Sequence, residues 1–416
     1  RVRRSGRESG PDSCAGRGAS CPGGSAMLNR FLRKIGLEVR RHAEDPYQAV
    51  ASVSTNQPKT GNALLAYLAE PFLSGNPTVL NSHTNYIESI AIVDSLNKLG
   101  FDVDVIDYRN RNFKPARDYQ LFVSARTNFA RIASRLNASC IKIAHLDTAH
   151  FIFNNAAASA RIRDLKDRRG VAAYSMRTIE KNWAPEAADY LAILGNEFTL
   201  GTYAYAGKPM FRLPVPTHEV YPSPADKDFS GMARNFVWMG SGGLAHKGLD
   251  LVLEAFAGMP DFQLTVCGPI DADYERHFRA EFNAELFESE NIRTVGWVDV
   301  SSDAFRDILS NSIGLVYPSA SEGQAGAVVT CMQGGLIPVI SYESGVDVGD
   351  HGIILSDCGV ETIRNTIQDL ASEPVDQLRQ RATSAWQYAR DNHTPEHYRD
   401  VYRSMIESIL DQSASR

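Results

Sequence analysis

The sequence lacks a long, uninterrupted apolar run. Its longest uncharged stretch, residues 323–342, has about the length of a membrane-spanning helix, but four glycines and several polar residues interrupt it. No comparable second stretch occurs in the chain. We therefore interpret it as a buried helix over 327–332, a Gly-Gly turn over 333–337 and a buried strand over 338–341.

Strong net charge and paired cysteines are also absent. The net charge of −6 argues against a general polyanion binder and hence against a nucleic-acid partner, although local basic patches stay open. The six cysteines show no C-x-x-C spacing and stand mostly in apolar runs, where a thiol acts as a small hydrophobic group. We expect reduced cysteines and a cytoplasmic protein.

The first residues contain almost no apolar side chains. Residues 1–26 are rich in Arg, Gly and Ser and cannot form the core of a signal peptide, so we expect a disordered extension. Residues 27–59 should hold a helix and a linker. The helix pairs an apolar face with a basic one, which leaves two interpretations open: peripheral contact with an anionic membrane surface on the inner face, or packing on its own protein. The apolar face consists of Leu28, Phe31, Leu32, Ile35 and Val39.

The length of the chain predicts two domains, because 416 residues exceed what one core usually organises. Strand-length apolar runs alternate with helical patterns between residues 60 and 215, which predicts a parallel sheet between helical layers. The expected strands are 63–69, 101–106, 121–124, 141–146 and 188–194, and the expected helices are 87–99 and 156–167.

The same alternation restarts after a Pro-rich linker, predicted at 216–233. Strands are expected at 236–239, 263–267 and 313–317, helices at 249–258 and 274–286, and C-terminal helices over 375–410 with a break near 392–395. We thus predict an α/β protein of two doubly wound, Rossmann-like domains, whose carboxyl sheet edges face a shared cleft. The domains are 60–215 and 234–390, and a helix within 391–416 packs back on the first.

A glycine turn between a strand and a helix is the first candidate site. Gly240, Gly242 and Gly243 allow a tight turn with exposed N–H groups, and Lys247 adds a cation before the helix, so a phosphate or diphosphate is the expected ligand. A plain turn with a surface lysine is the alternative. The dinucleotide fingerprint fits poorly, because the next strand ends without the carboxylate that would bind a ribose.

Glu322 stands alone at the head of the uncharged stretch, after a predicted strand. Its carboxylate can accept hydrogen bonds from sugar hydroxyls, and the backbone of the small residues around it can approach a phosphate closely. These residues are Ser321, Gly323, Ala325 and Gly326. A surface glutamate is the alternative. No D-x-D motif stands in a convincing context, so we expect no metal and no cofactor.

Four segments, "GSGGLAHKGLDLVLEAF", "FQLTVCGP", "NIRTVGWVD" and "YPSASEGQAGAVVTCMQGGLIPVIS", resemble the retaining glycosyltransferases of the GT-B fold (glycosyl transferases group 1, family 4-like). The resemblance covers about a quarter of the chain, residues 235–341. It implies that Lys247 pairs with the donor diphosphate and that Glu322 is the first glutamate of a Glu-x7-Glu motif, at the donor sugar.

Two positions depart from the family pattern. Its arginine partner for the diphosphate falls at Ser241, and Thr330 stands in place of the second glutamate, which holds the ribose. A hydroxyl accepts a weaker, uncharged hydrogen bond than a carboxylate does. Losing the stronger contacts would weaken nucleotide binding by about 1–3 kcal/mol. Three interpretations stay open: an altered donor site, compensation by nearby residues, or a domain that has lost catalysis.

In the first half, the resemblance places His150 just past a strand, near the transferred sugar; a structural loop histidine is the alternative. His83 and Asn85 are candidate acceptor contacts, with helix capping as the alternative. The basic residues Arg161, Arg163, Arg168 and Arg169 could meet an anionic acceptor, or form a solvated helix face.

The resemblance therefore implies an enzyme. It would move a sugar, with retention, from a nucleotide-diphosphate sugar to a hydroxyl of a glycan or lipid-linked acceptor, in polysaccharide or glycoconjugate biosynthesis. Two alternatives remain: a catalytically impaired homologue that acts as a partner or scaffold protein, and a sugar-nucleotide epimerase of the same fold.

Overall fold

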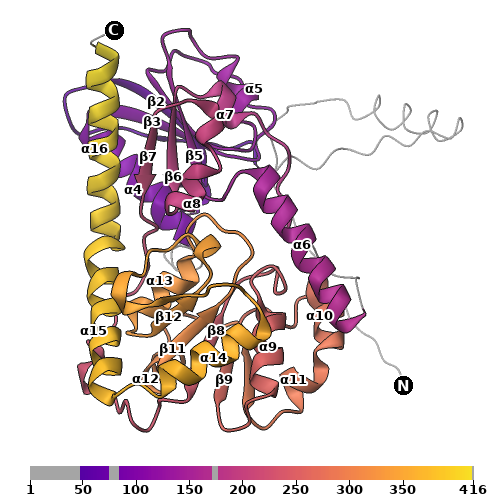
Figure 1. The fold of residues 1–416 in the computed structure, drawn as a ribbon. Helices are drawn as coiled ribbons and strands as arrows, with labels where there is room; N and C mark the ends of the chain where they lie inside the picture. The colour runs from indigo at the N-terminus through magenta and orange to yellow at the C-terminus, as the bar shows by residue number, and fades with distance from the viewer. Residues whose placement is uncertain (1–46, 75–83, 171–176, 415–416) are drawn as a thin grey trace, which may run out of the picture. The chain divides into compact units, whose positions relative to one another are not determined.

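The computed structural model describes residues 47–74, 84–170 and 177–414 (Figure 1). These residues belong to one compact unit. The predicted extension over 1–26 and the helix expected to begin at Leu28 lie outside the described residues.

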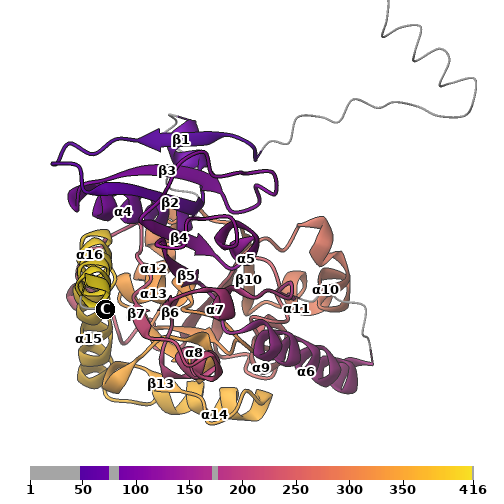
Figure 2. The same ribbon diagram turned by 90° about the horizontal axis from the view of Figure 1, so that it is seen from above.

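The first sheet has seven strands in the order β1-β3-β2-β4-β5-β6-β7, and we call residues 47–213 the first lobe. All neighbours pair in parallel except β1 and β3, which are antiparallel. Figure 2 shows β1 at the outer edge. The strands are β1 Val50–Val53, β2 Gly61–Tyr67, β3 Phe101–Asp107, β4 Leu121–Ala125, β5 Ile141–Leu146, β6 Tyr190–Leu194 and β7 Met210–Leu213.

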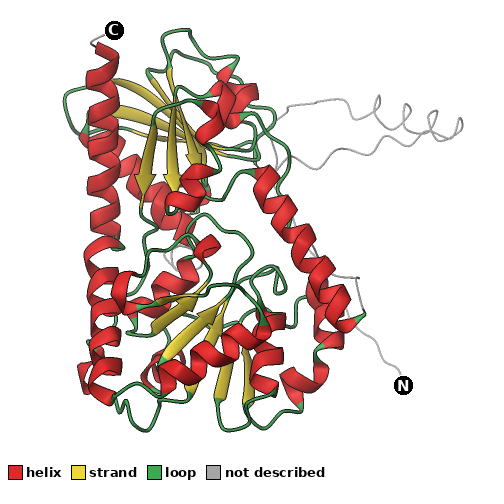
Figure 3. Cartoon of the chain, viewed as in Figure 1, coloured by secondary structure: helices red, strands yellow, loops and turns green. Residues whose placement is uncertain are grey.

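Helices cover this sheet, as the apolar faces of its buried strands require (Figure 3). Strands β2 and β4 consist almost wholly of buried residues, which is typical of a parallel sheet shielded on both faces. The helices are α2 Glu70–Leu73, α4 Thr84–Lys98, α5 Phe129–Ala133, α6 Phe151–Arg169, α7 Ala184–Ala187 and α8 Glu197–Gly201.

The second sheet has six parallel strands in the order β10-β9-β8-β11-β12-β13. We call residues 235–392 the second lobe. Its strands are β8 Asn235–Met239, β9 Gln263–Cys267, β10 Ile292–Gly296, β11 Gly314–Tyr317, β12 Ile337–Ile340 and β13 Ile353–Ile354. Its helices are α9 Leu249–Ala257, α10 Arg276–Glu281, α11 Asn283–Phe287, α12 Asp303–Ser310, α13 Gly326–Gln333, α14 Val360–Ala371 and α15 Val375–Asn392.

The last helix returns to the first lobe. Helix α15 ends at Asn392, and His393 and Thr394 separate it from α16 Pro395–Ala414. Helix α16 packs along α4 (Figure 1). Tyr398 and Tyr402 of α16 are fully buried, and the Ser95 hydroxyl of α4 donates to the Arg399 carbonyl over 3.2 Å. Helix α16 therefore completes the core of the first lobe.

Most predicted elements lie within a few residues of the observed ones. The helix predicted over 274–286 is wrong, because the chain turns at the fully buried Phe282 and forms α10 and α11. Strands β1, β7, β10 and β13 were not predicted, since they are short or carry polar residues on an exposed face.

Candidate active site

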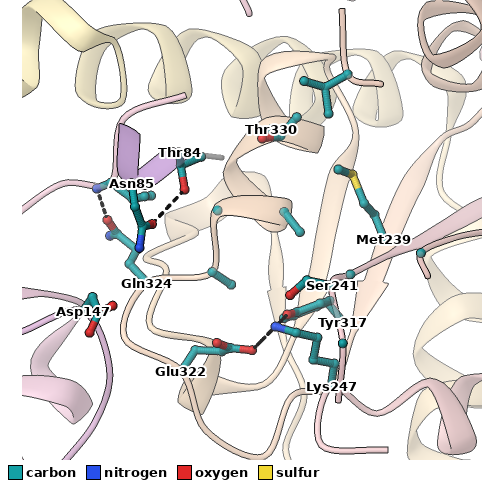
Figure 4. A pocket seen from close by; sticks show the side chains of 18 of the residues that line it. Thr84, Asn85, Asp147, Met239, Ser241, Lys247, Tyr317, Glu322, Gln324 and Thr330 are labelled. Atoms are coloured by element: carbon teal, nitrogen blue, oxygen red, sulfur yellow. Dashed lines mark hydrogen bonds and ion pairs between the residues drawn. The ribbon is translucent and has the colours of Figure 1, made fainter. Parts of the chain in front are cut away.

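The carboxyl ends of the two sheets border one cavity of about 540 Å³ (Figure 4). Such an edge is where doubly wound sheets bind ligands. The second lobe contributes the turn after β8 and the segment from Glu322 to Thr330. The first lobe contributes Asn85, Glu88, Arg126, Asp147 and Arg177.

Lys247 and Glu322, predicted from distant parts of the sequence, lie together in this cavity. The Lys247 ammonium is 2.5 Å from Glu322 Oε1, and the Tyr317 hydroxyl lies within hydrogen-bond reach of both, at 2.8 and 3.0 Å. Both charged residues are buried, with 5% and 7% exposure. Ser319 also donates to Oε1, so Oε2 is the oxygen of Glu322 left to face a ligand.

The charges of this pair depend on each other. Burial raises the pKa of Glu322, but the cations of Lys247 and Arg177 outweigh it and hold the pKa well below its ordinary value. Burial, with repulsion from Arg177, lowers the pKa of Lys247 to about 8 even though Glu322 opposes this shift. Burial also lowers the pKa of His246 to about 4. At neutral pH Glu322 is thus a carboxylate, Lys247 an ammonium and His246 a neutral imidazole.

The glycine turn offers fewer amides than its sequence predicts. The Gly240 amide donates to the Cys267 carbonyl, and the amides of Gly243 and Leu244 donate to Glu275 Oε1 at 2.6 and 3.2 Å. The expectation that Gly243 presents its N–H to a ligand is therefore wrong, because a buried carboxylate already accepts it. Within the described part of the chain, nothing accepts a hydrogen bond from the amides of Ser241 and Gly242, and both residues line the cavity.

The segment around Glu322 is fixed by the first lobe. The Ala149 amide donates to the Glu322 carbonyl over 3.1 Å, and the Thr199 hydroxyl donates to the Gly323 carbonyl over 3.0 Å. A side chain at Gly323 would meet the Asp147 carbonyl at 2.3 Å, so the two backbones can approach this closely only because the residue is glycine.

The predicted residues around Glu322 differ in where they lie. Ala325, Gly326 and Thr330 line the cavity. Ser321 and Gly323 do not line it; they fix the loop, since the Ser321 carbonyl lies 2.7 Å from His246 Nε2.

The candidate residues of the first half, two on the acceptor side and His150 near the transferred sugar, also differ in where they lie. Asn85 lines the cavity at the start of α4, and His83 lies outside the described residues. His150 does not line the cavity: it is buried at the start of α6, and its Nε2 lies 3.1 Å from the Tyr205 hydroxyl. The expectation that it reaches the sugar is wrong, because its ring packs against Tyr203 and Tyr205.

Three arginines of α6 join the two lobes, which neither sequence interpretation foresaw. The buried Arg161 donates to the carbonyls of Ala245 and Pro318. Arg168 pairs with Asp250, which is fully buried, and with Glu254. Arg169 adds pairs with Glu254, Glu281 and Glu285, and Arg163 is exposed.

Four charged residues of the cavity were missed by the sequence reasoning. Arg177 follows α6, and its Nη2 lies 3.9 Å from Glu322 Oε2. Arg126 pairs with Asp147, and Glu88 Oε2 accepts from the Tyr67 hydroxyl and lies 3.0 Å from His145 Nε2. Position after a strand could have indicated Arg126 and Asp147, but no local motif marks Arg177 or Glu88.

No group of three His, Cys, Asp or Glu side chains that could hold a metal ion occurs among residues 47–74, 84–170 and 177–414. In the same ranges, none of the helices combines the length and the apolar character that crossing a bilayer requires.

Two doubly wound sheets with a cavity between their carboxyl edges are typical of the GT-B fold. Sucrose-phosphate synthase from Thermosynechococcus elongatus has a similar structure, with a TM-score of 0.59 and 14% identity over 87% of this chain and 100% of that chain. HepE from Anabaena, in complex with UDP, gives a TM-score of 0.52 and 11% identity over 84% of this chain and 99% of that chain. At these identities the likeness establishes the fold.

Residues 233–373 match the family model described as glycosyl transferases group 1. They comprise the turn after β8, Lys247 and Glu322. A comparison with curated proteins found no match for the chain. The chain thus has the GT-B fold, and its second lobe holds a domain that matches the glycosyl transferases group 1.

Proposed function

We propose that this glycosyltransferase moves a sugar from a nucleotide-diphosphate sugar to a hydroxyl acceptor, with retention of the anomeric configuration. The observation that carries the proposal is the buried Lys247–Glu322 pair beside the glycine turn. This pair supports the proposal because a cation suits a diphosphate, a carboxylate suits sugar hydroxyls, and both lie in one cavity. Structures of HepE hold UDP or UDP-glucose, which makes uridine donors the first to test.

The geometry supports a role for each group. Charge grows on the diphosphate as its bond to the sugar breaks, and a preorganised cation beside that oxygen stabilises this charge without reorganisation. Lys247 and the amides of Ser241 and Gly242 are placed to do so, while Glu322 Oε2 accepts from the sugar. Thr330, elsewhere on the cavity wall, is assigned to the nucleoside. These protein groups supply the positive charge, and we propose no cofactor.

The acceptor belongs in a second cavity, of about 350 Å³, in the first lobe. It adjoins the donor cavity, since Asn85, Arg126 and Asp147 line both. Three tyrosine side chains and paired charges line it, a combination that suits a hydroxyl-rich acceptor with apolar ring faces. The tyrosines are Tyr67, Tyr86 and Tyr108. A glycan or a lipid-linked sugar meets this description, as polysaccharide or glycoconjugate biosynthesis requires.

Retention rests on the family resemblance alone and is tested by the anomeric configuration of the product. The cytoplasmic location that we propose is supported by the free thiols of Cys140, Cys267, Cys331 and Cys358, which suit a reducing compartment.

A thermal-shift screen tests the proposal. Purified protein is melted with UDP-, GDP-, dTDP- and ADP-sugars, and the screen is repeated with Lys247→Ala. We expect one donor class to raise the Tm of the wild type, and the substitution to remove most of that shift. Equal effects of all donors, or none, would remove the main support for a donor site.

The second candidate function is a non-catalytic partner protein. Ser241 and Thr330 favour it, because each supplies a hydroxyl where the family supplies a charged side chain. Binding without turnover, or no binding, would favour it. Conversion of the donor sugar without any acceptor would instead indicate an epimerase.

A further inference from the structure

We propose that Arg177, which belongs to the first lobe, is a second cation for the donor diphosphate and couples donor binding to the contact between the lobes. This inference rests on the proposed function. It concerns a residue that no local motif marks.

Among the residues that the structure describes, no carboxylate lies in close contact with the guanidinium of Arg177, which lies in the cavity. Its Nη2 is 3.9 Å from Glu322 Oε2, and its Nη1 is 3.4 Å from the Gly242 carbonyl oxygen. Both contacts are long for a group with five N–H donors. Its side chain keeps 36% of its surface accessible and lines the cavity. Most of its hydrogen-bonding capacity is thus available to a ligand.

Charge at this end of the cavity favours an anion. Among the described residues Glu322 is the only ion-pair partner of Arg177, with Asp147 attracting it less, and Glu322 already bonds Lys247 at 2.5 Å. Arg126 is matched by Asp147, and Glu275 lies behind the turn, where two amides bond it. Two cations therefore share one carboxylate. A diphosphate would supply the missing negative charge, and a guanidinium binds two phosphate oxygens at once.

The position of Arg177 is fixed in advance. Its backbone carbonyl accepts a 3.0 Å hydrogen bond from the side-chain Nδ2 of Asn154, a buried residue of α6. Its stem passes over the turn at Gly243, where an added Cβ would stand 3.2 Å from its Cδ. Gly243 also has a φ of +87°, which disfavours any side chain. A cation held in place loses little freedom when the ligand arrives.

Helix α6 connects Arg177 to the contact between the two lobes. Its carboxyl end is bound to the second lobe through Arg168 and Arg169, and Asn154 near its start holds Arg177. A diphosphate that contacts both Lys247 and Arg177 would bridge the two lobes, so its binding should strengthen their contact.

Binding of nucleoside di- and monophosphates to the wild type and to Arg177→Ala tests this inference. The diphosphate is whichever of UDP, GDP, dTDP and ADP binds the wild type most tightly, and the monophosphate has the same base. We expect Arg177→Ala to weaken diphosphate binding about 10- to 100-fold and monophosphate binding much less. Arg177→Lys should recover part of the preference for the diphosphate.

Arg168→Ala is the matched control, because it removes an arginine between the same lobes away from the cavity. It should lower the Tm and leave the ratio of diphosphate to monophosphate affinity unchanged. An equal loss for both nucleotides in Arg177→Ala, or a changed ratio in Arg168→Ala, would overturn the inference while the proposed function stands. If none of the four diphosphates binds the wild type, the proposed function fails and this inference with it.

Discussion

Two cationic segments meet at the cavity, and they differ in how the sequence marks them. The turn from Gly240 to Lys247 carries its signature locally, with glycines, a lysine and a following helix. Arg177 lies in a segment between α6 and β6 that has no such pattern. The role of the turn can be predicted from residues adjacent in sequence. The role of Arg177 depends on its contacts with Glu322 and Gly242, which belong to the other lobe.

The comparison shows which interactions a single sequence can reveal. A phosphate-binding turn needs a particular backbone, and backbone preferences are local. A side chain that reaches across from another lobe needs only sufficient length and a fixed anchor. Three measurements separate the local contribution from the long-range one.

Lys247→Ala should destabilise the protein by about 3–5 kcal/mol, because it leaves the buried carboxylate of Glu322 without its closest partner. Equilibrium urea unfolding measures this free energy. The double variant Lys247→Met with Glu322→Gln removes both charges and should be considerably more stable than the single one. If the two variants unfold alike, Arg177 and the hydroxyls around Glu322 suffice to hold its charge.

Gly323→Ala should cost about 1–3 kcal/mol, since its methyl group would stand 2.3 Å from the backbone oxygen of Asp147 in the other lobe. Gly326→Ala is the matched control in the same segment. Its nearest neighbour, in the side chain of Thr84, would be 3.6 Å away, an ordinary contact. Thermal melting compares them, and equal Tm values would show that the lobes do not need their close approach at Gly323.

Affinity for a nucleoside diphosphate should fall as the pH rises through about 8, because the Lys247 ammonium has a pKa near that value and attracts the ligand only when protonated. Calorimetry at pH 7 and pH 9 should show a loss of up to about tenfold. Lys247→Arg stays charged over this range, so its affinity should change little. An equal loss in that variant would assign the titration to another group.

The sequence could predict the fold because alternating strands and helices repeat along both halves. Strand β5 and β9, for instance, have their predicted bounds. Lys247 and Glu322 could also be predicted, since each follows a buried strand beside glycines. His150 was misplaced because proximity to a strand end does not set the direction of a ring. The arginines of α6 were misread because a basic helix face looks the same whether water or carboxylates cover it.

The sequence alone could thus predict two doubly wound domains, the glycine turn and the two residues that form the central ion pair. These depend on hydrophobic periodicity and on backbone preferences within a few residues. Only the tertiary structure decided which amides stay available, where Arg177 reaches and how α6 joins the lobes. Each of those depends on groups far apart in the chain, whose distances and competing partners exist only once the chain has folded.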